Sequence, residues 1–162
     1  VLYSGSVGGV IEALYRGVPG IAFSQARHED FCVNDIDAVY EGTREYILSI
    51  IQYIRKNPLS TGSFLNVNFP CSGGYFKGVK FAVQGRGYHV EKLKQTGPSS
   101  YWLGCDFCEC DEPVDSEITL LREGYITATP LQVSSVTDHT AVRSHKNKFD
   151  QYMAESLAVS LV

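Results

Sequence analysis

Apolar positions divide the chain into a first part with alternating strand and helix patterns and a second part rich in short strands. Residues 7–16 have a helical pattern that Gly17 ends, and residues 20–24 form a continuous apolar run typical of a buried parallel strand. From residue 34 to residue 56, apolar side chains recur at helical spacing, which predicts a long amphipathic helix closed by Asn57-Pro58. The first part therefore has the pattern of an α/β fold.

The second part begins at residues 64–69, where apolar and polar side chains alternate as in a strand until Pro70. Further elements are expected as short strands over 79–83, 87–93 and 101–104, a short helix over 116–122, a strand over 124–131 and a terminal helix over 147–162. We therefore predict a single domain with three parts, namely an α/β core over 1–70, a strand-rich β-hairpin extension over 71–146 and a C-terminal helix over 147–162. Because an extended hairpin is too exposed to be stable alone, we expect it to pack on another subunit.

Composition narrows the class of protein. The 162 residues suit one compact domain with a buried core. No apolar run is long enough to span a membrane, and the net charge of -4 argues against a nucleic-acid polymer as partner. A mononucleotide stays possible because a local anion site needs no basic surface. Five cysteines without a regular framework favour a reducing compartment, so we expect a cytoplasmic protein.

Three of the cysteines, Cys105, Cys108 and Cys110, lie close together among acidic residues. Three thiolates could bind zinc, but a structural zinc site needs four ligands and no second paired cluster exists. The alternative is a variable loop without a metal. Both interpretations stay open at this point.

The segment with the strongest chemical signal is Tyr3-Ser4-Gly5-Ser6, directly before the first helix. A helix N-terminus presents unpaired N–H groups and a partial positive charge, so it stabilises a phosphate. The glycines would let the backbone approach that phosphate, and the two serine hydroxyls would add donors. The plain alternative is a serine N-cap, with glycines that allow tight helix packing.

A third interpretation of the same segment is a serine hydrolase that uses Ser6 and His139. A nucleophile elbow requires Gly-x-Ser-x-Gly between a strand and a helix. Here Ser4 occupies the place of the first glycine, so the pattern fails at a position chosen for steric reasons. This hypothesis is the weakest of the three.

Five segments in the same order resemble the survival protein SurE family of 5′/3′-nucleotidases. They are Tyr-Ser-Gly-Ser-Val-Gly from residue 3, Leu-Tyr-Arg-Gly-Val-Pro-Gly-Ile-Ala-Phe-Ser from residue 14, Phe-Leu-Asn-Val-Asn-Phe-Pro from residue 64, Tyr-Trp-Leu-Gly from residue 101 and Gly-Tyr-Ile-Thr-Ala-Thr-Pro-Leu from residue 124. The resemblance implies a Rossmann-like three-layer core with a swapped C-terminal extension, and hence a homodimer or tetramer. It covers roughly the last two thirds of the family pattern. Val1-Leu2-Tyr3 reads as the end of a strand, so we expect the core to be incomplete at the N-terminus.

The resemblance also implies an activity. Family members are metal-dependent phosphatases that act on nucleoside monophosphates, with acid phosphatase activity. Ser4, Gly5 and Ser6 would hold the substrate phosphate, and His139, beside Asp138, would protonate the leaving group. The divalent metal, Mg or Mn, would be bound by residues that precede the turn in the family, so no metal ligand is expected in this chain. The rival hypothesis is a non-catalytic binding or oligomerisation module, because that ligand segment has no counterpart here.

Overall fold

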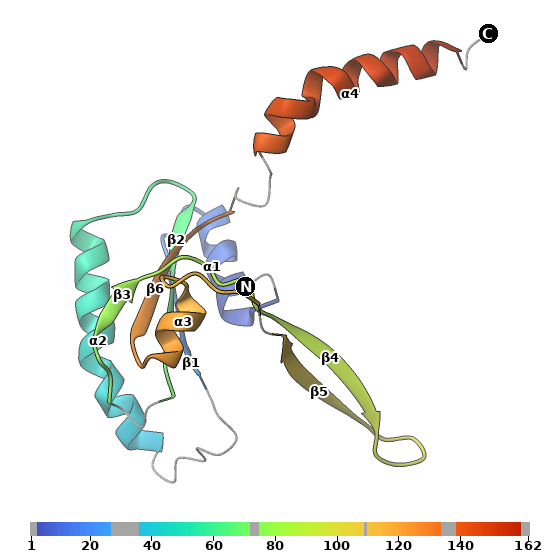
Figure 1. Ribbon diagram of the computed structural model, residues 1–162. Helices are drawn as coiled ribbons and strands as arrows, with labels where there is room; N and C mark the ends of the chain where they lie inside the picture. The colour runs from blue at the N-terminus through green and yellow to red at the C-terminus, as the bar shows by residue number, and fades with distance from the viewer. Residues whose placement is uncertain (1–2, 27–35, 72–74, 109, 134–138, 160–162) are drawn as a thin grey trace. The chain divides into compact units, whose positions relative to one another are not determined.

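The computed structural model describes residues 3–26, 36–71, 75–108, 110–133 and 139–159, and its ribbon is drawn in Figure 1. Its elements are α1 (Gly5–Tyr15), β1 (Ile21–Gln25), α2 (Ile36–Lys56), β2 (Ser63–Phe69), β3 (Val79–Phe81), β4 (Tyr88–Gln95), β5 (Tyr101–Cys108), α3 (Glu117–Arg122), β6 (Ile126–Gln132) and α4 (His139–Val159). The chain divides into two compact units, residues 1–131 and 132–162, and each is described by itself.

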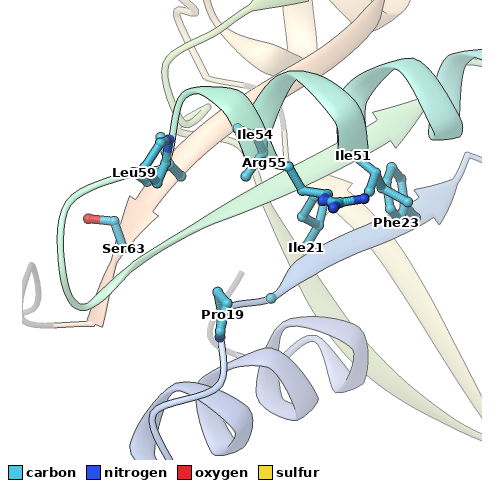
Figure 2. A pocket seen from close by; sticks show the side chains of 10 residues that line it. Pro19, Ile21, Phe23, Ile51, Ile54, Arg55, Leu59 and Ser63 are labelled. Carbon is cyan, nitrogen blue, oxygen red and sulfur yellow. The ribbon is translucent and has the colours of Figure 1, made fainter.

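The first unit contains a four-stranded sheet in the order β1-β2-β6-β3. β1 and β2 pair in parallel, and so do β3 and β6. The two pairs run in opposite directions (Figure 1). The ring of Phe69, the last residue of β2, contacts that of Phe76, three residues before β3, so the end of β2 lies near the start of β3. The sheet is therefore mixed. α2 covers one face, and α1 and α3 cover the other, which confirms the predicted three-layer α/β core (Figures 1 and 2).

The core lies between the sheet and α2. Its central side chains come from β2 and β6, where Leu65, Val67 and Ile126 are at most 1% exposed. α2 contributes Ile50 to this cluster, with Ile47 and other apolar side chains packed against it. The amphipathic pattern over residues 34–56 thus predicted both the helix and its buried face.

α1 begins and ends with the local signals that its sequence contains. The Ser4 side chain accepts a hydrogen bond from the Val7 N–H, which makes Ser4 the N-cap. At the other end Gly17 adopts a φ of 74°, a left-handed conformation that glycine reaches without steric cost. The helix then packs closely on the start of β1, because a Cβ on Gly20 would lie 2.8 Å from Val10 Cγ1. The predicted ends of this helix are confirmed to within two residues.

β4 and β5 form an antiparallel hairpin outside the main sheet, with Tyr88 opposite Cys108 and Gln95 opposite Tyr101. Glu112 closes the base of this hairpin. Its carboxylate accepts hydrogen bonds from the Arg86 N–H at 2.9 Å and from the Gly87 N–H at 2.7 Å. A two-stranded ribbon is marginally stable alone, so this clamp contributes to its anchoring.

The Glu112 clamp predicts a pH dependence. Burial acts to raise the pKa of Glu112, but the hydrogen bonds from Gly87, Ser116 and Arg86 outweigh it and hold that pKa below its ordinary value. The stabilisation is therefore present above the ordinary carboxyl pKa and is lost as the pH falls through the lowered one. We expect the melting temperature to fall more between pH 6 and pH 3 in the wild type than in Glu112→Gln, as measured by circular dichroism. Equal falls would contradict the clamp.

The second unit contains α4, which begins at His139 rather than at residue 147 as predicted. Its first two turns are mostly polar and lack the apolar periodicity that indicates an amphipathic helix. Local bonds support them instead, such as the bond that the Ser144 hydroxyl donates to the Thr140 carbonyl at 3.0 Å. Within the described parts of the chain, no helix is both long and apolar enough to cross a membrane.

Candidate functional site

The turn before α1 has the geometry of a helix N-cap. Ser4 is extended, with φ -78° and ψ 122°, and its Oγ lies 3.4 Å from the Val7 nitrogen. Gly5 and Ser6 follow as the first exposed residues of the helix. Among the described residues, no hydrogen-bond acceptor is found for their two backbone N–H groups. The cap uses a lone pair of the Ser4 oxygen, so its hydroxyl proton stays available to a ligand.

The glycines of this turn have room around them. A Cβ on Gly5, Gly8 or Gly9 would meet nothing within 4 Å in the part of the chain that the structure describes. Tight helix packing therefore does not explain them here. Open space beside N–H groups that have no acceptor among the described residues instead suits a small anion such as phosphate.

The turn lies near the edge of the sheet where β1 and β2 end. Val10 packs against Gly20, just before β1 begins. From Val10 back to Ser4 the helix axis extends about 9 Å, which corresponds to about three residues along a strand. Because α1 runs antiparallel to β1, this places Ser4 close to the level of Phe23 and Ser24. The carboxyl ends of parallel strands are where ligand sites of α/β proteins usually lie.

A row of polar side chains occupies the sheet face beneath α1 and α3. Glu117, the first residue of α3, is 8% exposed. Its Oε2 accepts hydrogen bonds from Asn68 Nδ2 at 3.2 Å, Thr129 Oγ1 at 3.2 Å and Asn66 Nδ2 at 3.5 Å. The hydroxyl of Thr127, on the same face, is buried with no partner among the described residues. This row of polar side chains connects β2, β6 and α3. It lies on the face of the sheet that α1 covers, and the Ser4–Ser6 turn is at the start of α1.

The sequence reasoning missed this row. Its signal was present, because Asn66 and Asn68 alternate with apolar residues in a strand that helices cover on both faces. Polar side chains at such positions need partners from another element. The partner, Glu117, is 49 residues from Asn68 in sequence, so no local pattern could identify it.

The geometry of Ser6 does not favour a nucleophile. Ser6 lies inside the first turn of α1. A nucleophile elbow holds its serine in a strained turn, whereas no described residue other than glycine has a positive φ. The structure therefore lacks the feature that a serine hydrolase centred on Ser6 would require.

The expected acid lies where the structure gives little detail. His139 is the first residue of α4, in the second unit, and its side chain is not described. Asp138 falls outside the described residues. The predicted role of this pair stays a prediction.

The cysteine segment differs from the predicted loop, because β5 continues through Cys108. Cys108 and Cys110 are free thiols. Within the described ranges, no three or more histidine, cysteine or acidic side chains are grouped to hold a metal ion. Among the described residues, the structure therefore gives no support to the zinc interpretation.

A hollow of about 520 Å³ lies on the other side of the sheet, between β1 and α2 (Figure 2). Its lining is mainly apolar and includes Ile21, Phe23, Ile54 and Leu59. Arg55 extends from α2 toward Ile21 and Phe23 (Figure 2). Ile21 and Phe23 point toward α2, whereas the turn belongs to the layer of α1. This hollow is therefore separate from the candidate phosphate site.

The chain is similar to known proteins in sequence and in structure. Residues 1–91 match the family described as survival protein SurE. The 5′-nucleotidase SurE of Protochlamydia amoebophila is 35% identical over 159 residues, which cover 94% of this chain and 58% of that protein. The 5′/3′-nucleotidase SurE of Citrobacter koseri is 30% identical over 150 residues, covering 90% of this chain and 54% of that protein.

A solved structure, the SurE protein from Aquifex aeolicus, superposes on 90% of this chain and 58% of its own with a TM-score of 0.63. Its sequence identity of 23% supports similarity of fold alone. The chain spans little more than half the length of the curated relatives it matches.

Proposed function

Because this chain belongs to the survival protein SurE family, we propose that the intact protein hydrolyses nucleoside monophosphates as a 5′/3′-nucleotidase, with acid phosphatase activity. The relatives' names support a nucleotidase. The observation that carries the proposal for this chain is the exposed turn Ser4-Gly5-Ser6, with two N–H groups lacking a described acceptor, at the N-terminus of α1.

In the proposed mechanism, the turn binds the phosphate of the substrate. The N–H groups of Gly5 and Ser6 and the hydroxyls of Ser4 and Ser6 would donate to its oxygens. The helix adds a partial positive charge at the same place. Donors fixed before the reaction stabilise the negative charge that the phosphoryl group develops in the transition state without reorganisation.

We further propose that a divalent ion, Mg or Mn, takes part and that residues outside this chain bind it. The described residues do not fit such an ion, because they contain no suitable group of ligands. His139, with Asp138 beside it, is proposed as the acid that protonates the leaving oxygen.

We also propose that the protein is located in the cytoplasm.

The second candidate function is a non-catalytic binding or oligomerisation module. It is favoured by the same lack of a ligand group among the described residues. The two candidates make opposite predictions about phosphate release, so one experiment separates them.

We also propose that copies of the protein associate through the hairpin and α4, as a homodimer or tetramer. One face of the hairpin presents Leu93, Tyr101 and Leu103, each at least 59% exposed. α4 separately exposes Phe149 and Tyr152, which lie on one side of the helix. Exposed apolar groups of this kind mark protein interfaces.

The test of the activity is release of phosphate from AMP by the intact protein in the presence of Mn²⁺. We expect Ser6→Ala to lower kcat/KM by about 10- to 100-fold, since it removes one donor to a developing charge. Ser60→Ala, which alters an exposed serine bonded to Ser63 far along the chain, is the control and should leave the rate unchanged. Absence of phosphate release in the wild type would favour the non-catalytic module.

A further inference from the structure

We propose that Asn68 contacts the sugar hydroxyls of the substrate and that Glu117 is the positioning residue that holds the Asn68 amide for this contact. This inference rests on the proposed function, because it takes the Ser4–Ser6 turn as the phosphate site. It adds a determinant of specificity for phosphorylated sugars over other phosphate esters.

The first support is the bonding of Glu117. A carboxylate that is 8% exposed needs partners, and the described ones are three neutral donors on β2 and β6. The bond to Asn68 takes one N–H of that amide at 3.2 Å. It thereby determines which end of the amide faces Glu117 and directs Oδ1 away from it. An asparagine without such a partner could turn its amide over.

The second support is the difference between the two asparagines of β2. Asn66 is 6% exposed beneath α3, so a ligand has no access to it. Asn68 is one pleat nearer the end of the strand and is partly exposed. In the register of the sheet it lies beside Ser24 of β1, which is also partly exposed. Among the described residues, the bond to Glu117 is the one that the Asn68 side chain makes.

The third support is position. The spacing of α1 along β1 places the turn close to the level of Phe23 and Ser24. Asn68 occupies the neighbouring place on β2, on the face that α1 covers. A substrate whose phosphate is bound by the turn would therefore extend its next atoms over Ser24 and Asn68.

Electrostatics decides which part of the substrate meets Asn68. The Glu117 carboxylate lies directly behind the amide, so a second anion in front of it would be repelled. The N–H groups of α1 attract the phosphate to the turn instead. A sugar hydroxyl is neutral and can donate to Asn68 Oδ1, and the carboxylate behind the amide makes that oxygen a stronger acceptor.

The experiment compares two substrates of the intact protein, AMP and p-nitrophenyl phosphate, which has no sugar. We expect Asn68→Leu to raise the KM for AMP about five- to tenfold, as the loss of one hydrogen bond implies. The KM for p-nitrophenyl phosphate and the inhibition constant of inorganic phosphate should not change. An equal rise in all three would overturn the assignment to the sugar, and no rise for AMP would overturn the contact.

The role of Glu117 is tested through non-additivity. Glu117→Gln should raise the KM for AMP in the same direction as Asn68→Leu. The double variant should be no worse than Asn68→Leu alone, because Glu117 acts through Asn68. Losses that multiply would show that Glu117 does not act in this way.

Thr129→Val is the matched control, since Thr129 Oγ1 bonds to the same carboxylate oxygen at the same 3.2 Å. It should lower the melting temperature and raise the KM for AMP less than Asn68→Leu does, because the bond between Glu117 and Asn68 remains. If Glu117→Gln fails to fold, the two substrates still decide the role of Asn68. The proposed function is tested separately by Ser6→Ala. If Ser6→Ala loses activity but Asn68→Leu leaves the KM for AMP unchanged, this inference is overturned and the proposed function is not.

Discussion

Gly5→Asp should abolish most of the proposed phosphatase activity of the intact protein while leaving the fold as stable as before or more so. A unit charge about 4 Å from the phosphate is repelled by about 4 kcal/mol near a protein surface. We therefore expect kcat/KM to fall by at least about a hundredfold. The same aspartate favours the helix by about 0.3–1 kcal/mol, because it lies at the positive end of the dipole.

The matched control is Gly9→Asp, one turn further along α1. Like Gly5, Gly9 is exposed and a Cβ there meets nothing within 4 Å of it among the described residues. The two variants therefore add the same charge to the same helix at different distances from the turn. Phosphate release from AMP and thermal melting are measured on both. Similar losses of activity would contradict a phosphate site at the turn.

Leu93→Glu together with Leu103→Lys should dissociate the proposed oligomer. The two residues are paired across β4 and β5, so the new charges face each other and preserve the hairpin. Burial of a leucine contributes about 1.5–3 kcal/mol. The two losses together correspond to a rise in the dissociation constant of more than about a hundredfold. Light scattering coupled to gel filtration would measure the change in mass.

The opposite face of the same hairpin provides the control. Lys92 and Asp106 form an exposed ion pair there. Exchanging the two residues keeps the pair and leaves the apolar face unaltered, so the mass should not change. A monomeric wild type, or a dimer that persists in the leucine double variant, would contradict association through this face.

Local sequence patterns predicted the helices whose caps or apolar periodicity lie within the helix or at its ends. α1 is bounded by a serine cap and a left-handed glycine, and both signals lie within a few residues of the ends that they determine. α2 was predicted from its period because one face packs on β2 and β6. The polar first half of α4 has no such period, so its start at His139 was missed.

Patterns of single segments do not specify the direction of a strand within a sheet. Residues 124–131 were predicted correctly as a strand, which is β6 in the structure. That prediction did not include the direction of β6, which is antiparallel to its neighbour β2 (Figure 1). The direction follows from the long path through the hairpin and α3, which returns the chain to the sheet from the end of β2. Similarly, the segment that contains Cys105 and Cys108 has the sequence of a loop, whereas β5 continues through Cys108.

The sequence by itself therefore determined the family, the three-layer α/β class and the capped turn before α1, because motifs and caps are local. Only the tertiary structure joined Asn66, Asn68 and Thr129 to Glu117, and placed the turn at the edge of the sheet near Asn68. The physical reason is that a buried carboxylate must find its donors in space, on strands that are distant along the chain.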